Sequence, residues 1–225
     1  MINVWFIRHG ESEANAGLPT TNPATTPLTE RGHHQAQQVA LAFAQAPNLI
    51  VTSPYRRTQQ TAQPTRERFP DADHLEWQVQ EFTYLAPKRY QNTTVDERRP
   101  ISDAYWQQGN PLYVDGEGAE SFADLMQRVQ DVQAKLRQLA TAGPKFVVVF
   151  SHGRFMRAVL WAILTHSTEV SAKRMRQFYG FIGSFSVPNG SILKLHLHDS
   201  EIWFSGIHTS HLSEYSEGRT NPSTP

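Results

Sequence analysis

Residues 2–15 read INVWFIRHGESEAN, and this stretch guides the interpretation of the whole chain. Residues 2–7 form a largely apolar run that is typical of a buried strand. Arg8, His9 and Gly10 follow this run directly. A surface turn requires neither an arginine nor a histidine side chain, so this pair at the end of a strand suggests a functional site.

The same arrangement occurs twice more along the chain. A second strand-like run, LIVT, is followed by SPYRR, which contains Arg57, and a third, KFVVVF, is followed by SHG, which contains His152. Ligands of open α/β sheets bind outside the carboxyl ends of the strands. Each residue alone also fits a structural role, but together Arg8, His9, Arg57 and His152 predict an anion site, because arginine forks match phosphate oxygens.

Strand-like and helix-like segments alternate along the sequence, which predicts one α/β domain over residues 1–209 with a mostly parallel central sheet flanked by helices. Thr29 is a plausible helix N-cap, and Ser121 with Asp124 resembles a capping box. From residue 210 the sequence is a polar tail, 210–225. The expected strands are 2–7, 49–53, 75–82, 145–151, 191–198 and 201–205, and the expected helices are 28–46, 54–69, 120–140 and 154–164.

Residues 83–118 show no sustained period and contain several prolines and aromatic residues. Long irregular insertions in compact domains are uncommon and often functional, so we expect this one to cover the site and to select the substrate. Four basic residues of the insertion either contact further phosphates or carboxylates of a substrate or lie on a solvated loop: Lys88, Arg89, Arg98 and Arg99.

The composition restricts the partners and the compartment. The chain has 225 residues, and its 21 Lys and Arg residues balance its 21 Asp and Glu residues. A neutral chain gives no bulk electrostatic reason to expect nucleic acid or an anionic membrane as a partner. The sequence lacks a signal-peptide pattern and an apolar run of about 20 residues, which predicts a soluble, cytoplasmic protein. Without cysteine there are no thiolate ligands. Nothing in the sequence sets the oligomeric state.

The sequence resembles the histidine phosphatase superfamily, which includes the cofactor-dependent phosphoglycerate mutases. The resemblance runs from residue 2 to about residue 195 and implies their three-layer fold. Six blocks carry it in order: FIRHGESEAN, PLTERGHHQA, SPYRRTQQTA, GAESFADLMQRV, VVVFSHG and PNGSILKL.

The resemblance implies roles for individual residues. His9 would be the nucleophile that becomes phosphorylated, and Glu81 the general acid, with Glu76 as its rival. Neither a metal nor another cofactor is implied, and the partner would be a small phosphorylated substrate. The phosphoryl group would be bound by Arg8, Arg57, His152 and Gly153. Polar wall residues would be Ser12, Asn15 and Thr29, of which Ser12 and Thr29 fit a helix cap equally well.

The chain also departs from the family pattern. The run of residues that surrounds the acid in the mutases is absent from LEWQVQEFTYLAP, which favours a phosphatase over a mutase. Arg154, directly after SHG, is not explained by the pattern. Alternative functions are a mutase-type phosphoryl transferase, a phosphate-binding protein without activity, and a metal-dependent hydrolase with ligands among His196, His198, His208 and His211.

Overall fold

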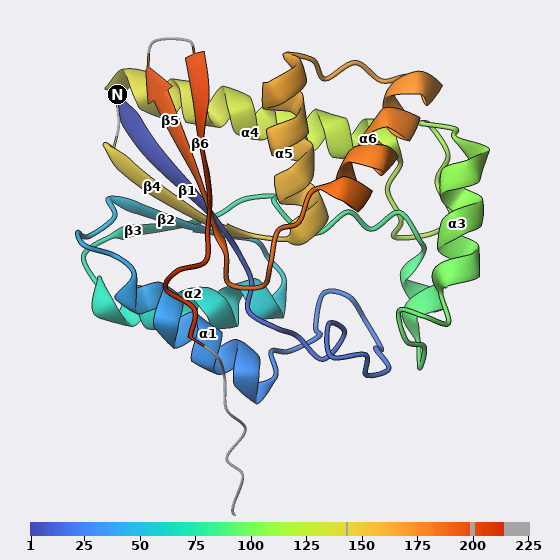
Figure 1. The fold of residues 1–225 in the computed structure, drawn as a ribbon, viewed down its shortest axis with the longest axis horizontal. Helices are drawn as coiled ribbons and strands as arrows, with labels where there is room; N and C mark the ends of the chain where they lie inside the picture. The colour runs from blue at the N-terminus through green and yellow to red at the C-terminus, as the bar shows by residue number, and fades with distance from the viewer. Residues whose placement is uncertain (143, 199–200, 214–225) are drawn as a thin grey trace, which may run out of the picture.

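The computed structural model describes residues 1–142, 144–198 and 201–213. Six strands form one sheet in the order β3-β2-β4-β1-β5-β6 (Figure 1). The neighbours β3, β2, β4 and β1 are parallel, whereas β5 runs antiparallel to β1 and to β6. The predicted α/β fold with a mostly parallel sheet is therefore confirmed. The strand bounds are Ile2–Arg8 (β1), Leu49–Thr52 (β2), Asp73–Glu76 (β3), Phe146–Ser151 (β4), Ile192–His198 (β5) and Glu201–His208 (β6).

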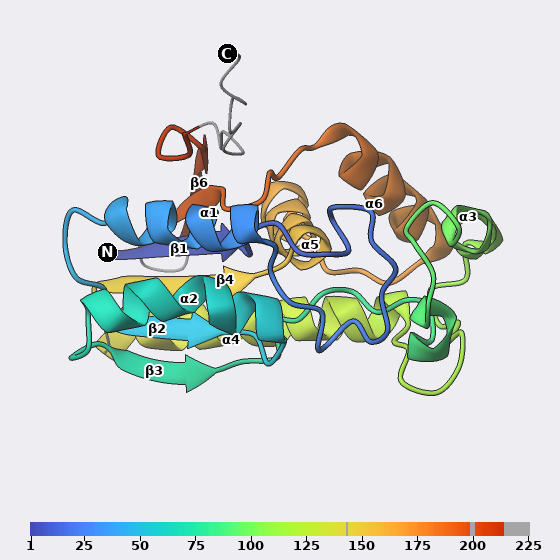
Figure 2. The same ribbon diagram turned by 90° about the horizontal axis from the view of Figure 1, so that it is seen from below.

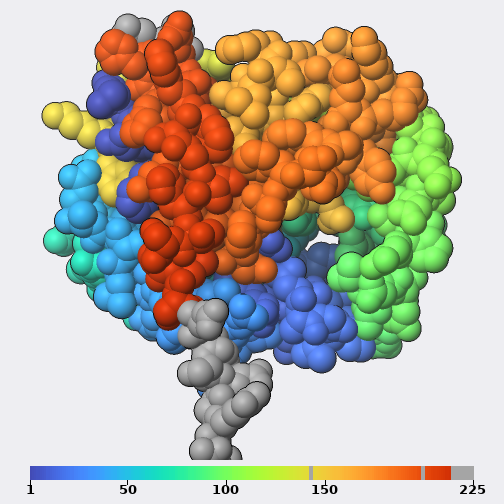
Figure 3. All heavy atoms as spheres, viewed as in Figure 1, coloured from blue at the N-terminus to red at the C-terminus, as the bar shows by residue number. Residues whose placement is uncertain are grey.

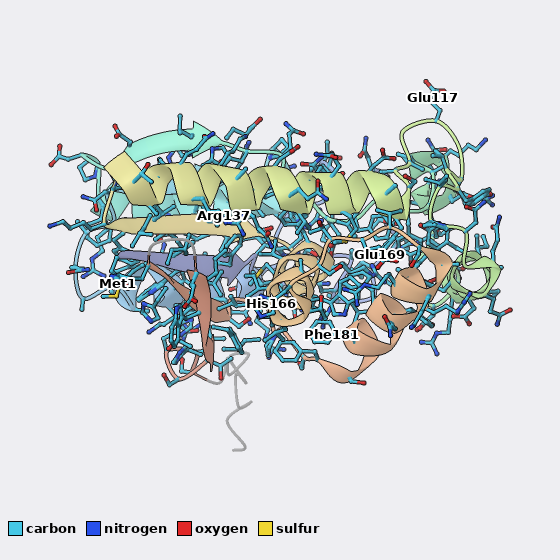
Figure 4. The ribbon with its side chains drawn as sticks, turned by 90° about the horizontal axis from the view of Figure 1, so that it is seen from above. Met1, Glu117, Arg137, His166, Glu169 and Phe181 are labelled. Atoms are coloured by element: carbon cyan, nitrogen blue, oxygen red, sulfur yellow. The ribbon has the colours of Figure 1, made fainter. Side chains whose placement is uncertain are left out.

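Helices cover both faces of the sheet and produce three layers. Helices α1 and α2 lie together on one face (Figure 2), and α4 and α5 lie on the other, where α4 runs along the molecule (Figure 4). Successive residues of β4 point to opposite faces: Val147 and Val149 belong to one apolar core, Val148 and Phe150 to the other. The helix bounds are Glu30–Leu41 (α1), Arg56–Arg68 (α2), Arg99–Gln108 (α3), Phe122–Ala142 (α4), Gly153–Thr165 (α5) and Ala172–Ser184 (α6).

Side-chain caps start two of the expected helices as predicted. The Thr29 hydroxyl accepts a hydrogen bond from Gly32 N at 3.1 Å and caps α1. Ser121 and Asp124 form a reciprocal box before α4, with bonds of 3.1 Å to Asp124 N and 2.8 Å to Ser121 N. Helix α6 was not expected from the sequence, although Ser171 caps it by accepting a bond from Arg174 N.

The segment 83–118 is not irregular throughout, which corrects the expectation from the sequence. It contains a 3-10 turn, η1 (Pro87–Tyr90), and the ten-residue helix α3. Pro100 lies in the first turn of α3, where a missing N–H costs nothing, and Gly109 ends the helix with a φ of 60°. Tyr105 and Trp106 of α3 are buried in the main core. One buried pair in so short a helix leaves little periodicity to detect.

The strand expected at 75–82 is also wrong for most of its length, because β3 ends at Glu76. Trp77 N still donates to Thr52 O at 3.0 Å, but the carbonyls of the next three residues accept hydrogen bonds from side chains. Ser151 donates to Val79 O at 2.7 Å, and Arg128 Nη1 donates to the carbonyls of Gln78 and Gln80, each at 3.0 Å. These carbonyls are therefore not paired in the sheet, and Glu81 follows an extended segment rather than a strand.

The two late strands were expected from the sequence, and they form an antiparallel hairpin with Leu195 opposite Phe204. Most of the predicted tail, 214–225, lies outside the described residues. At its start, His211 Nε2 bonds with Gly190 O at 2.9 Å. Among the helices that the structure describes, none combines the length and the apolar character needed to cross a membrane.

Candidate active site

Parallel pairing of β1 and β4 brings His9 and His152, the two histidines predicted for the site, together. Arg8 lies opposite Ser151 in the register, so His9 and His152 leave the sheet side by side, with ring centroids 5.1 Å apart. The backbone after His9 lies directly against the start of α1: a Cβ on Gly10 would be 2.4 Å from Gly32 O. Glycine at this position therefore permits the close approach that holds the His9 loop.

The hydrogen bonds of His9 define its tautomer. Gly10 O is an acceptor only, so His9 Nδ1 carries the proton and donates to it at 2.6 Å. Arg57 Nε donates to the other ring nitrogen, His9 Nε2, at 3.1 Å. His9 is therefore a neutral imidazole whose Nε2 lone pair faces the Arg57 guanidinium.

The second histidine has the opposite tautomer. Arg57 Nη2 donates to His152 Nδ1 at 2.9 Å, so the proton lies on Nε2, which bonds to Ser53 Oγ at 2.9 Å. Arg57 also donates to Pro23 O. One buried guanidinium thus contacts both histidines, at Nε2 of His9 and at Nδ1 of His152.

Arg8 is the second cation of the cluster. Its Nη1 donates to Val187 O at 2.6 Å, while its buried Nε has no hydrogen-bond partner among the described residues. Burial lowers the pKa of Arg8 to about 10, and the nearby Glu81 carboxylate opposes this shift. Gly153 permits the packing of Arg8, because a Cβ there would be 3.2 Å from Arg8 Nε.

Burial and positive charge keep both histidines neutral. Desolvation lowers the pKa of His9 well below 6.5, and the charges of Arg57 and Arg8 lower it further. Desolvation, followed by the charge of Arg57, acts in the same direction on the pKa of His152. A neutral imidazole next to two guanidinium groups is suited to attack an anion that the arginines bind.

Glu81 lies at the N-terminus of α5, beside this cluster. Its Oε1 accepts backbone N–H bonds from Phe82 at 3.1 Å, Arg154 at 3.0 Å and Phe155 at 3.2 Å. Its Oε2 accepts one longer bond, 3.3 Å, from Arg154 N. The rival Glu76 is exposed on β3, where Gln59 donates to it, and does not line the cavity.

A partly buried ion pair holds the segment that carries Glu81. Arg128 of α4 pairs with Glu120 at 2.6 Å, and Arg128 also binds the backbone on one side of Glu81, at Gln78 O and Gln80 O. On the other side, Glu120 Oε1 accepts a bond from Thr83 N at 2.9 Å. We call Glu120 and Arg128 the acid clamp, because the pair fixes the backbone on both sides of Glu81.

The cluster opens into a cavity of about 310 Å³. Figure 3 shows a hollow bordered by the loop after β1, in blue, and by the 83–118 segment, in green. Ser12 and Asn15 line the cavity and bond to each other at 3.0 Å, and Asn189 donates to the same Asn15 oxygen at 2.9 Å. Thr29 does not line it and serves as a cap. Arg8, His9, Arg57 and Glu81 are lining residues, whereas His152 lies behind Arg57.

The basic residues of the insertion have different positions. Arg98 and Arg99 line the cavity, and Arg99 pairs with Asp96 at 2.6 Å. Arg89 pairs with Asp115 at 2.5 Å, and neither it nor Lys88 lines the cavity.

The histidines of the alternative metal site do not gather. His208 pairs with Ile192 at one end of the hairpin and His198 with Glu201 at the other, while His196 bonds with the Asn3 side chain. Within the described ranges, no three His, Asp or Glu side chains form a group that would hold a metal ion.

Several residues of the site did not emerge from the sequence patterns. Ser53 and Asn189 bond to the site residues, and the acid clamp lies within the GAESFADLMQRV block. Arg154 lines the cavity directly after the SHG motif. The position of Arg154 after a strand end could have predicted this, because the other basic residues that follow strand ends also lie at this cavity.

Fold and site together define an α/β protein with a histidine–arginine anion pocket at the carboxyl edge of its parallel strands. The chain belongs to the histidine phosphatase superfamily (branch 1), whose family model matches residues 4–205.

Curated relatives match parts of the chain. A protein named "Probable phosphoglycerate mutase GpmB" from Photorhabdus laumondii is 42% identical over 64 residues, 28% of this chain and 30% of that protein. An "Adenosylcobalamin/alpha-ribazole phosphatase" from Salmonella typhi is 27% identical over 130 residues, 56% of this chain and 64% of that protein. The chain thus spans between about a third and two thirds of the length of these relatives.

Solved structures share the fold over nearly the whole chain. The alpha-ribazole phosphatase from Shigella flexneri has a TM-score of 0.70 and 21% identity, and the match covers 96% of this chain and 100% of that chain. Phosphoserine phosphatase from Entamoeba histolytica, in complex with 3-phosphoglyceric acid, has a TM-score of 0.71 and 21% identity, with 95% and 100% covered.

Proposed function

We propose that this protein hydrolyses a small phosphomonoester through a phosphohistidine intermediate on His9. The observation that carries the proposal is the state of His9: a neutral ring whose Nδ1–H is bound by Gly10 O and whose Nε2 faces Arg57. Such a ring is oriented to attack phosphorus with Nε2 while keeping its proton on the far nitrogen. Family membership supports the same chemistry.

In the first step, Arg8 and Arg57 hold the equatorial oxygens, where negative charge is concentrated in the transition state. His152, which lies behind Arg57 and accepts a bond from its Nη2, positions this guanidinium. Arg57 now donates to the lone pair that must attack, so its N–H turns to a phosphoryl oxygen as the substrate binds. The unpartnered Nε of Arg8 supplies a further donor for the same group. The P–O bond to the alcohol breaks as the bond from His9 Nε2 to phosphorus forms.

Glu81 is the group that exchanges protons with the leaving group and with water. Its Oε1 already accepts three backbone bonds, so Oε2 is the oxygen that carries the transferable proton. After giving this proton to the departing alkoxide, Glu81 acts as a base and removes a proton from the water that attacks the phosphohistidine. No step of this scheme requires a metal ion or an organic cofactor.

The test combines product analysis with trapping of the intermediate. We expect ³¹P NMR to show inorganic phosphate from one or more members of a panel of phosphomonoesters. Rapid quenching with ³²P-labelled substrate should give an acid-labile, base-stable adduct that is absent from His9→Ala. A fully active His9→Ala protein would refute the mechanism. An isomeric phosphate ester without inorganic phosphate would favour a mutase, and binding without turnover would favour a phosphate-binding protein.

The cytoplasmic location stays a prediction from the sequence.

A further inference from the structure

The cavity carries more positive charge than one phosphoryl group requires. Five arginines and one glutamate line it, the arginines being Arg8, Arg57, Arg98, Arg99 and Arg154. A bound phosphomonoester carries at most about two negative charges. Arg8 and Arg57 hold that group in the proposed function, and Arg99 pairs with Asp96. Among the described residues, Arg98 and Arg154 form no ion pair.

Arg154 is held against an aromatic wall rather than an acid. Its guanidinium carbon lies 5.0 Å from the centroid of the Tyr84 ring, and its Nη2 contacts Tyr84 Oη at the long distance of 3.5 Å. The Tyr84 hydroxyl is itself bonded to Ser102 Oγ at 2.8 Å. In the described part of the chain, no carboxylate forms an ion pair with Arg154.

Arg98 has a similar environment on the insertion. Its Nη1 bonds to Thr93 and Thr20 oxygens, and its guanidinium carbon lies 4.4 Å from the centroid of Tyr90. Burial lowers the pKa of Arg98, and the positive charge of Arg154 contributes to the same shift. Both arginines line the same cavity, and among the described residues neither forms an ion pair. A second anion in the cavity would offset their positive charges.

We propose that the alcohol part of the substrate carries a second anionic group, a carboxylate or a phosphate, that binds between Arg154 and Arg98. The tyrosine and serine hydroxyls of this wall supply neutral donors, and the arginine forks supply charged ones. The inference rests on the proposed function and deepens it, because it makes the substrate class a small phosphomonoester with a second negative charge.

The test uses pairs of substrates that differ in this charge alone. For the carboxylate, 3-phosphoglycerate is compared with glycerol 3-phosphate, in which a hydroxymethyl group replaces the carboxylate. For the second phosphate, fructose 1,6-bisphosphate is compared with fructose 6-phosphate. The measured quantity is the ratio of kcat/KM values within each pair, in which effects common to both substrates cancel.

We expect the anionic member of at least one pair to be preferred by roughly 10- to 100-fold, the effect of hydrogen bonds to a charged group. Arg154→Met should reduce this ratio toward one, and Arg154→Lys should restore part of it. The matched control is Arg137→Met, on α4 and outside the cavity (Figure 4), which should keep the ratio. Arg98→Met is a second test, although its contacts with Thr93 make folding a necessary check.

The outcome separates this inference from the proposed function. If p-nitrophenyl phosphate is hydrolysed but neither pair shows a preference, the second anion site is refuted and the hydrolase proposal stands. If no ester is hydrolysed, calorimetric affinities for the same pairs decide the inference: tighter binding of the anionic member, lost in Arg154→Met, supports it, and equal affinities overturn it.

Discussion

Replacing Glu81 with glutamine tests whether this residue gives a proton to the leaving group, which a poor leaving group needs and a good one does not. The hydrogen bonds of Glu81 indicate that a glutamine side chain would keep the same position. Oε1 accepts the three shorter backbone bonds, which an amide oxygen also accepts, and only the 3.3 Å bond from Arg154 N to Oε2 is lost. The side chain should therefore stay at the start of α5, and a measured effect on rate reports the missing proton.

The expected size follows from general acid catalysis. A positioned acid contributes about 10²- to 10⁴-fold, which corresponds to roughly 3 to 5 kcal/mol of activation free energy. An alkyl phosphate such as 3-phosphoglycerate needs this proton and should be slowed by that factor in Glu81→Gln. The p-nitrophenolate anion leaves without a proton, so p-nitrophenyl phosphate should be slowed by less than about tenfold.

Single-turnover quench measurements are the appropriate assay, because in the proposed mechanism Glu81 acts again as a base when water cleaves the phosphohistidine. Glu76→Gln is the matched control: it removes a carboxylate that is exposed on β3 and outside the cavity, and should leave both rates unchanged. Equal slowing of both substrates by Glu81→Gln would refute the reasoning, as would an effect confined to Glu76→Gln.

Three further predictions concern the same cavity. First, because burial holds the pKa values of His9 and His152 below those of the unfolded chain, the unfolded state takes up more protons below about pH 6.5. The free energy of unfolding should therefore fall as pH decreases, by roughly 1 kcal/mol per pH unit for each histidine, and denaturant titrations of His9→Gln should show a shallower dependence. Second, activity should survive exhaustive chelation, and loss on EDTA with recovery on added zinc would contradict the metal-free scheme. Third, Gly153→Ala places a methyl group 3.2 Å from Arg8 Nε and should raise KM for phosphomonoesters several-fold, with little change in melting temperature; an unchanged KM would show that Arg8 shifts freely.

The central sheet was predictable because its strands are continuous apolar runs that end in abrupt polar motifs. The position of each motif at a strand end was enough to bring Arg8, His9, Arg57 and His152 together, since parallel strands end at one edge. The sequence did not reveal α3 and α6, which pack against each other through a few aromatic contacts, such as Trp106 stacked on Tyr179 with ring centroids 4.8 Å apart. Such contacts join residues distant in sequence and produce no local period.

The role of Arg154 was also out of reach from the sequence alone. Its contact with Tyr84 depends on how the 83–118 segment folds back over the sheet edge, and no local pattern specifies that path. A hydrogen bond from Thr20 N to Thr93 O, at 3.0 Å, joins this segment to the loop after β1. The cavity wall therefore depends on long-range pairing, whereas the catalytic cluster depends on strand order.

The acid clamp has a consequence for how this architecture diversifies. Glu81 is fixed by Glu120 and Arg128 and by the bond from Ser151 to Val79 O, so its position is independent of the residues that contact the alcohol part of a substrate. Substitutions of cavity-lining residues such as Arg98 and Ser102 can therefore accumulate without displacing the proposed proton donor. A lineage with this clamp can exchange one metabolite for another while its bond-breaking chemistry stays the same.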